Sequence, residues 1–449
     1  MSGSPEGMYE PGIVDPGLPV PKPTQPFWLS QPHPLANHQS PWPTTPVDVA
    51  IIGSGVTGTN LARTLLARRP DLRVVVIEAR SLCSGAIGRN GGHIKTMTFA
   101  VWEDRKRAYG VDEAIRLIAF EHSHLDAMTG VARDKGIECD AVLTEGIDAY
   151  FNQQTFDKAL AALADMRKHA PHLASRYTIH TDRDRLQRVM KLSERCVGAI
   201  VVPAASIWPY KPVTRLMGPL IRGGKLNVQT HTTVESIDDD PSRELAVVRT
   251  ARGNIDARHV VHATNGWLGH LLPELRPFVS PVRGNVVHYA AFSYWLRYAE
   301  KDYDYLIQRA GGDVVVGRAN LRRRATGDDS ETDSAPISHL RGLADAQMAA
   351  APSPAATVDR AWSGILGFAQ DGSPFVGRLP FPGRGHQWVC GAYHGVGMTK
   401  AFRSAEMLAY LILGEELPDE YPRSMTVTEE RVLKLRKSLD EGSRLKMKL

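Results

Sequence analysis

The chain has 449 residues, of which 43% are hydrophobic and 23% are charged, and its formal net charge is +5 at pH 7. That length predicts two joined domains, and the small, dispersed charge gives no case for nucleic acid as a partner. No apolar run reaches the roughly 18 residues of a membrane span. The four cysteines are scattered without a CxxC pair. We therefore expect no disulfide framework, no metal site and a reducing, cytoplasmic location.

The first 46 residues contain twelve prolines and almost no periodicity. Such a segment forms neither a helix nor an interior strand, so residues 1–46 are predicted to be a proline-rich N-terminal arm. Residues 1–20 are expected to be a loose tail. From Phe27 to Trp42 the arm carries large apolar side chains that are costly to leave in water. This part is predicted to lie against the folded body.

Residues Val47–Arg80 form the motif around which the chain is organised. An apolar strand leads into Gly53-Ser-Gly55-Val-Thr-Gly58, a helical stretch follows, and a second apolar strand ends at Glu78. This strand–turn–helix–strand unit is typical of dinucleotide binding, because its glycines allow a tight turn, close approach of a pyrophosphate and close helix packing. An acid at the position of Glu78 can accept hydrogen bonds from ribose hydroxyls.

A glycine-rich loop, Ser81–Thr96, follows the motif, and its small residues let backbone approach a flat ligand closely. Arg89 and His93 are the polar side chains that this loop would direct toward the ligand. The charged run 318–333 reads as a solvated loop. Periodicity predicts the next helices at 100–137, 153–169, 181–189, 213–223 and 337–350. Apolar runs predict strands at 140–151, 197–203, 224–238, 245–250, 254–257, 259–263, 281–289, 313–318 and 387–390.

Two further features lie near the C-terminus. The run Gly395–Met398 precedes a helical stretch, 399–413, so its amides and the helix dipole can face an anionic group. Thr426 and Glu429 fit a capping box that opens a terminal helix ending near Asp440.

Several motifs occur here in one order: Gly53–Gly58 with Glu78, Gly88–Gly92, Pro281–Asn285, Asp371–Gly377 and Gly395–Met398. Over Pro26–Leu417 the chain resembles the D-amino-acid oxidase-like superfamily of FAD-dependent oxidoreductases, and within it the gamma-glutamylputrescine oxidase-like branch. The resemblance implies an α/β fold in which a Rossmann-like FAD-binding domain is interleaved with a mixed-sheet α+β substrate domain. The implied segments are 47–99, 186–281 and 358–420 for FAD, 100–185 and 282–357 for substrate, and 421–449 for a C-terminal helix.

The resemblance also implies which residues hold FAD. The glycine motif would take the pyrophosphate, and Gly395–Met398 would face the flavin edge where negative charge develops on reduction. The implied cofactor-binding residues are Gly53, Gly55, Val56, Thr57, Gly58, Glu78, Ala79, Arg80, Arg89, Asn90, Gly91, Gly92, Val234, Ala263, Thr264, Asn265, Gly266, Gly395, Val396, Gly397 and Met398. Cys83 and His93 do not fall on the positions at which relatives attach flavin covalently, so noncovalent FAD is expected.

For the reaction, the resemblance implies oxidation of the C–N bond of an amine or amino-acid-like small molecule by hydride transfer to flavin, with oxygen as the acceptor. The candidate catalytic residues are Arg283, His93, Tyr393 and His394. Arg283 is expected either to bind a carboxylate or polar tail of the substrate in bidentate fashion or only to anchor its strand. Sarcosine-oxidase-like relatives have a late Gly-His-Gly-Phe-Lys run, from which Gly395–Thr399 departs.

Other classes remain open. An NAD(P)H-dependent flavin monooxygenase shares the first motif but should show a late Gly-Asp-Ala-type run, where Gly395–Met398 stands instead. A tailoring flavoenzyme of the same fold that does not oxidise amines would keep every cofactor motif. A flavoprotein without turnover would keep the first motif and block the flavin face.

Overall fold

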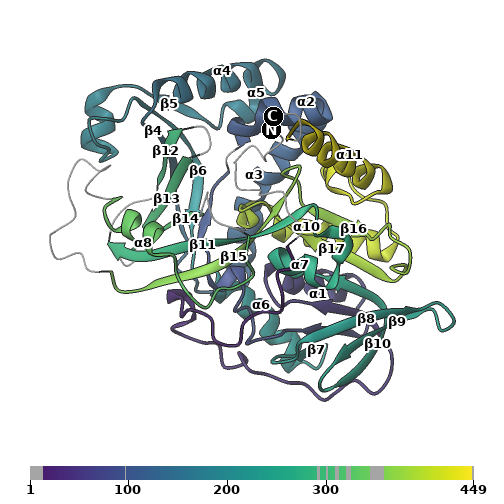
Figure 1. Cartoon of the computed structure of the whole chain (residues 1–449). Helices are drawn as coiled ribbons and strands as arrows, with labels where there is room; N and C mark the ends of the chain where they lie inside the picture. Colours follow the sequence, from purple (N-terminus) through teal and green to yellow (C-terminus); the bar gives the residue numbers. More distant parts are fainter. Residues whose placement is uncertain are drawn as a thin grey trace.

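The computed structural model describes residues 14–96, 98–290, 294–299, 302–308, 313–319, 325–343 and 358–446. Two large sheets, each covered by helices, lie beside one another (Figure 1). Each sheet takes strands from early, middle and late parts of the chain. The chain is therefore interleaved between two halves, as the resemblance implied.

The first sheet is built around the dinucleotide motif. Its strands are β1 (Val47–Ile52), β2 (Val74–Ile77), β7 (Leu226–Gln229), β8 (Val234–Asp240), β9 (Leu245–Thr250), β10 (Gly253–His262), β16 (Phe375–Arg378) and β17 (Gln387–Gly391). The order is β16-β17-β10-β1-β2-β7, and β8 and β9 extend from β10. β1 runs parallel to β2 and β10, as in a Rossmann-like sheet. Because β1 is buried on both faces, its sequence is an almost unbroken apolar run.

Helices from distant parts of the chain pack together against this sheet. Helix α1 (Val56–Arg68) contacts both α6 (Tyr210–Arg222) and α10 (Ala401–Leu413). Leu61 and Leu65 of α1 are fully buried in that layer. The start and the end of the chain are therefore joined in one hydrophobic core next to the glycine turn.

The second sheet is mixed. Its order is β15-β11-β14-β13-β12-β4-β6-β3, with β5 beside β6. The strands are β3 (His93–Ile94), β4 (Val142–Tyr150), β5 (Thr178–His180), β6 (Gly198–Ser206), β11 (Val279–Ala290), β12 (Tyr294–Ala299), β13 (Asp302–Gln308), β14 (Asp313–Ala319) and β15 (Ala361–Ala369). β12 pairs in parallel with β4, whereas the other pairs in this sheet are antiparallel.

Helices cover both faces of the second sheet. Successive side chains of β6 point to opposite sides: Ile200 belongs to the core beneath one helical layer and Val201 to the core on the other face. The helices on or near this sheet are α2 (Trp102–Tyr109), α3 (Val111–Asp134), α4 (Gln153–His169), α5 (Pro171–Ala174) and α8 (Ser334–Arg341). The remaining helices are α7 (Leu268–Leu271) and the terminal α11 (Glu429–Lys446).

Most predicted helices are present, with shifted ends. The stretch 100–137, expected to hold one or two helices, holds two, α2 and α3, and the terminal helix continues past the expected end at Asp440. The helical piece expected over 181–189 is present at 183–189 and has π-helical hydrogen bonding over Arg185–Val189. Residues 344–350 of another expected helix lie outside the described residues. β6 and β15 belong to the second sheet, so the sheets do not follow the boundaries expected at 186 and 358.

The N-terminal arm lies along the body from residue 14 onward. Trp28 is fully buried, which confirms the prediction for the part between Phe27 and Trp42. The expectation of a loose tail is wrong for residues 15–20, since Asp15 hydrogen-bonds to His270 and Arg276. Residues 1–13 lie outside the described part.

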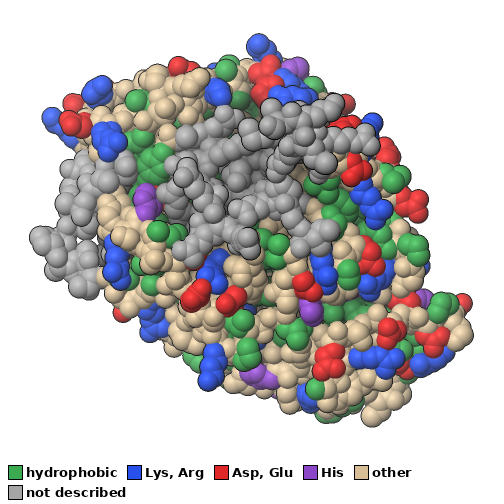
Figure 2. All heavy atoms as spheres, in the orientation of Figure 1, with side chains coloured by type: hydrophobic (Ala, Val, Ile, Leu, Met, Phe, Trp, Pro, Cys, Tyr) green, Lys and Arg blue, Asp and Glu red, His purple; other side chains and the backbone are tan. Residues whose placement is uncertain are grey.

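On the face drawn in Figure 2, Lys and Arg side chains are interspersed with Asp and Glu side chains. Within the described ranges, every helix is too short or too polar to cross a membrane. In those ranges, no three histidine, cysteine or acidic side chains converge as metal ligands would.

Candidate active site

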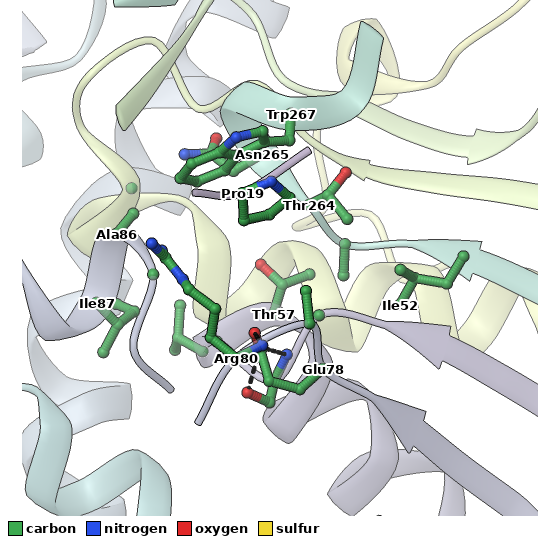
Figure 3. Close-up of a pocket in the computed structure, with 18 of the residues that line it drawn as sticks. Pro19, Ile52, Thr57, Glu78, Arg80, Ala86, Ile87, Thr264, Asn265 and Trp267 are labelled. Carbon is green, nitrogen blue, oxygen red and sulfur yellow. Dashed lines mark hydrogen bonds between the residues drawn. The ribbon is translucent and has the colours of Figure 1, made fainter. Parts of the chain in front are cut away.

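A cavity of about 190 Å³ lies at the carboxyl ends of β1, β2 and β10, beside the start of α1 (Figure 3). This is the edge of a parallel sheet at which dinucleotides bind. Most of the expected cofactor-binding residues line it: Gly53, Gly55, Val56, Thr57, Glu78, Ala79, Arg80, Asn90, Val234, Ala263, Thr264, Asn265, Gly395, Gly397 and Met398. The cavity thus joins segments from both ends of the chain.

The three motif glycines have three different environments. Gly53 has φ +109°, and an added Cβ would lie 2.7 Å from the Ala263 carbonyl oxygen. A Cβ on Gly58 would lie 2.0 Å from the Gly53 oxygen, so Gly58 is required for helix packing and does not line the cavity. A Cβ on Gly55 would meet open space, and Gly55 does line the cavity. Gly53 and Gly58 therefore show the turn and the close packing that the motif predicts, and Gly55 leaves open the space that a pyrophosphate would need.

Glu78 lies on the cavity wall with its carboxylate held by its neighbours. Its oxygens accept hydrogen bonds from the Ser54 backbone N–H at 3.1 Å, the Ser54 hydroxyl at 2.6 Å and the Arg80 backbone N–H at 3.0 Å (Figure 3). A carboxylate offers about four acceptor positions. Glu78 thus keeps acceptor capacity for ribose hydroxyls while its orientation is fixed.

A buried acid that the sequence did not reveal joins three segments beside this cavity. Asp329 is 0% exposed, and its carboxylate contacts Arg80 Nη1 at 3.0 Å and Arg89 Nε at 3.2 Å. The Asp329 carbonyl accepts a hydrogen bond from the Thr24 N–H of the arm. Burial lowers the pKa of Arg89 to about 10, which Asp329 opposes. The expectation of a solvated loop over 318–333 is therefore wrong at Asp329.

The arm also contributes to the wall of the first cavity. Gly17, Leu18 and Pro19 line it, and Pro19 lies near Thr264 and Trp267 (Figure 3). The sequence predicts a loose tail for these residues, because a proline-rich run has no periodicity that shows which surface it contacts.

A second cavity, of about 110 Å³, adjoins the first. The two share five wall residues: Ala86, Asn90, Leu366, Gly395 and Met398. Aromatic side chains of β12 and β13 and the buried Lys95 form much of the remaining wall. Burial lowers the pKa of Lys95 to about 8, opposed by Asp148, whose carboxylate lies 2.7 Å from Lys95 Nζ.

Two of the candidate catalytic residues lie on these walls. His93 lines the second cavity, and burial lowers the pKa of its imidazole well below the usual value, with Lys95 adding to the shift. Tyr393 lines the first cavity. Its hydroxyl is 2.7 Å from Thr57 Oγ1 and 3.2 Å from Cys390 Sγ, and burial raises its pKa well above the usual value.

The other two candidates line neither cavity. His394 Nδ1 is 3.0 Å from the Ala369 carbonyl, and burial lowers the pKa of this histidine to about 3. The Arg283 guanidinium donates to the Asp328 carbonyl at 2.7 Å and contacts Glu331 at 3.0 Å and Asp333 at 3.3 Å. These acids occupy the donors that a substrate carboxylate would need. The geometry thus places neither residue on the wall of these two cavities, and it favours the strand-anchoring alternative for Arg283.

Some expected cofactor residues support the cavities or line only the second one. Arg89, Gly91 and Val396 line the second cavity. Gly92 and Gly266 line neither, and an added Cβ on Gly266 would lie 2.8 Å from Ile365 Cγ2. The role of these two glycines in the structure is close backbone packing.

The model of the family of FAD-dependent oxidoreductases matches residues 48–411. The chain belongs to this family. Among curated relatives of the oxidoreductase, gamma-glutamylputrescine oxidoreductase of Escherichia coli is 25% identical over 82% of this chain and 84% of its own length. The probable oxidoreductase OrdL of Rhizobium meliloti is 26% identical, over 82% of this chain and 83% of its own.

Solved structures show the same fold. Glycine oxidase from Geobacillus kaustophilus superposes with a TM-score of 0.70 at 20% identity, over 86% of this chain and 99% of the other. L-Proline dehydrogenase from P. horikoshii gives a TM-score of 0.65 at 17% identity, over 85% and 97%. The D-amino-acid oxidase-like fold expected from the sequence is confirmed.

The first cavity of this oxidoreductase fits its cofactor, FAD. The open space at Gly55 leaves room for a pyrophosphate against the backbone, and the first amides of α1 supply hydrogen-bond donors. Glu78 supplies acceptors for a ribose, and Gly395 and Met398 form the far end, where the second cavity begins. All four cysteines are buried and free, and none lines either cavity. This agrees with noncovalent binding of FAD.

Proposed function

We propose that the enzyme oxidises the C–N bond of a small amine and passes the electrons to molecular oxygen. The observation that carries this proposal is the second cavity, which meets the FAD cavity at Gly395 and Met398. A small molecule bound there would present a C–H bond to the redox ring of FAD. Bound FAD accepts a hydride, with both electrons of the C–H bond.

Two bonds to hydrogen break in the substrate. The carbon next to nitrogen loses a hydride, and the nitrogen loses a proton to water, which leaves an imine. Hydrolysis of the imine gives a carbonyl compound and a shorter amine or ammonia. Oxygen takes up two electrons and two protons and leaves as hydrogen peroxide.

The chain's own part in this reaction is to bind, orient and exclude water. The imidazole of His93 is neutral over the physiological range, because burial lowers its pKa well below the usual value, so it adds no charge beside the reacting nitrogen. Tyr393 bridges Thr57 of the glycine motif and Cys390 of β17. It thereby ties together the two segments that would hold the cofactor.

Anaerobic mixing with a panel of primary and secondary amines tests the proposal. At least one amine should bleach the flavin absorbance near 450 nm, and air should restore the colour with release of hydrogen peroxide. Reduction by NAD(P)H, with no amine in the panel active, would instead favour the monooxygenase alternative. Amine reduction without reoxidation in air would remove oxygen from the proposal and leave a dehydrogenase.

We also place the enzyme in the cytoplasm. This location is supported by the cysteines, all four of which are free thiols buried in the fold. Reducing compartments keep such thiols from pairing. Fractionation of the source cells, with detection by an antibody against the chain, tests the assignment.

A further inference from the structure

Aromatic rings form one wall of the second cavity, and the sheet fixes their positions. Trp295 of β12 and Tyr303 of β13 are stacked, with ring centroids 5.3 Å apart and an interplanar angle of 20°. The ring of Tyr305 fills the space that two glycines leave: a Cβ on Gly91 would lie 2.4 Å from that ring and a Cβ on Gly317 2.1 Å. This wall is therefore rigid, and it favours contact with an apolar group.

Other residues that line the second cavity are aliphatic or aromatic as well: Val286, Ile365, Leu366 and Phe368. The cavity volume of about 110 Å³ is of the order of the roughly 150 Å³ apolar cavities that bind benzene. A single ring or a short alkyl chain is the size of substituent that this cavity accommodates.

The two cationic side chains among the described lining residues are already paired with buried acids. Lys95 Nζ lies 2.7 Å from Asp148 Oδ1, and the two side chains are 0% and 1% exposed. Arg297 lies 3.6 Å from the same oxygen, on the strand beside Asp148. Arg89 is held by Asp329 and by two backbone carbonyls besides that of Thr24. Asp148 is shared by Lys95 and Arg297, and Asp329 by Arg80 and Arg89, so a substrate carboxylate would compete with an internal carboxylate for either lining cation.

No aspartate or glutamate occurs among the described residues that line this cavity, so an ammonium group would also lack a counter-charge there. The polar groups on the wall that carry no net charge include the Asn90 amide and the Thr399 hydroxyl. Burying an unpaired charge costs far more free energy than burying a neutral polar group. The cavity therefore suits a molecule that is uncharged throughout the part it buries.

We infer that the second cavity takes an uncharged amine whose reactive carbon bears no carboxylate, and that Asp148 sets this preference by neutralising Lys95. The inference rests on the proposed function, whose substrate class it names. Asp148 is a specificity-determining residue that acts through Lys95. The aromatic wall of Trp295 and Tyr303 then holds the apolar substituent of the amine.

A binding measurement that needs no turnover tests the charge preference. Calorimetry with the FAD-loaded enzyme compares two molecules of nearly equal shape, phenylacetamide and phenylacetate. The amide should bind at least tenfold more tightly than the carboxylate. Asp148→Asn removes the carboxylate that pairs with Lys95 and keeps its pKa from falling further. A bound phenylacetate can then take the place of that carboxylate and restore the charge of Lys95, so the preference for the amide should fall at least tenfold, with the flavin content unchanged. Equal or tighter binding of phenylacetate by the wild type, or failure of both molecules to bind, would overturn the inference.

A variant of the aromatic wall tests where the apolar substituent binds. Trp295→Ala should weaken phenylacetamide binding at least tenfold, because it removes a ring of the cavity wall. The control is Trp42→Ala, which removes an indole from the arm where it contacts Arg252, outside both cavities. This control should leave binding unchanged. Equal effects of the two substitutions, or none, would contradict the placement of the substituent.

A turnover measurement separates this inference from the proposed function. Phenethylamine is compared with phenylalanine, and benzylamine with phenylglycine, by the rate of anaerobic flavin reduction. The amines should reduce the flavin at least a hundredfold more efficiently than the amino acids. Comparable reduction by the amino acids would refute the substrate class and leave amine oxidation standing. Selective amide binding without reduction by any amine would refute the proposed function instead.

Discussion

Gly55 and Gly58 belong to one motif, yet side chains at the two positions would meet different surroundings. At Gly55 an added Cβ points into open space in the FAD cavity, whereas at Gly58 it would lie 2.0 Å from a backbone oxygen. Gly55→Val should therefore give a folded, colourless protein whose melting temperature matches that of the wild-type apoprotein. Gly58→Val should lose both stability and flavin. Absorbance at 450 nm and melting temperature distinguish the two, and a yellow Gly55→Val protein would contradict the cofactor site.

Arg283 is expected to matter for stability. Its guanidinium pairs with Asp333, which is 2% exposed, and removal of one member of a buried pair costs roughly 3 kcal/mol. Arg283→Met should lower the free energy of unfolding by about that amount, with flavin reduction in the folded fraction within twofold of wild type. The control is Arg249→Met, which breaks an exposed pair with Asp238 and should cost under about 1 kcal/mol. A stable Arg283→Met enzyme with slow flavin reduction would restore the substrate-anchor hypothesis.

The sequence predicts a residue of the site when the signal is local. Gly53, Gly55 and Glu78 are spaced along one strand–turn–helix–strand unit, so their roles follow from the motif. Lys95 and Asp148 are 53 residues apart, and Arg80 and Asp329 are 249 apart. Neither pair has a spacing that sequence reading can detect, because their meeting depends on how the two sheets are built.

At the scale of elements, a neutral histidine makes one of the hydrogen-bonded contacts between α3 and α10. His124 Nδ1 lies 2.8 Å from the Phe120 carbonyl, and its Nε2 accepts a hydrogen bond from the Arg403 backbone N–H at 3.1 Å. A proton on Nε2 would face another donor. Burial lowers the pKa of His124 to about 4, below the value near 6.5 of an unfolded chain. The unfolded chain alone therefore binds this proton between about pH 6.5 and about pH 4.

That difference predicts an acid-sensitive contact. The stability associated with neutral His124 is complete above pH 6.5 and falls by about 1.4 kcal/mol for each pH unit toward pH 4. A glutamine at position 124 stays uncharged and can still accept a hydrogen bond from the Arg403 backbone N–H. The slope of the free energy of unfolding against pH should therefore be smaller in His124→Gln than in the wild type, by the contribution of one proton. Urea denaturation between pH 4.5 and pH 7 measures both slopes. The exposed His172→Gln is the control, and equal slopes for all three proteins would refute the prediction.

Element types follow from periodicity, but sheet membership does not. The apolar stripes of α3 and α4 identify these helices because each buries one face. β6 carries apolar residues on both faces, since helices cover both sides of its sheet. A strand that is apolar on both faces fits either sheet. The sequence therefore predicts that β6 is a strand, but not which of the two sheets it joins.

At the scale of the whole molecule, the arm is expected to retain the cofactor. Residues 17–19 line the FAD cavity and are held there by the contacts of Asp15 with His270 and Arg276. Deletion of residues 1–20 should leave the fold intact, because Trp28 and the rest of the N-terminal arm remain. The same deletion should speed FAD release at least tenfold. Flavin fluorescence after dilution follows the release. Deletion of residues 1–13 is the control, and equal release rates from both truncations would show that the arm does not retain FAD.

The assembly of the FAD cavity from both ends of the chain has a consequence for biosynthesis. A ribosome that has made Gly53–Thr57 must add about 340 residues before Gly395 exists. At roughly 5–20 residues per second this takes on the order of 20 to 70 s. A chain whose synthesis stops within that interval would carry the glycine motif but would lack the C-terminal residues of the FAD cavity wall. Acquisition of the yellow colour therefore reports that translation has passed Ala401, the last of the described residues that line the cavity.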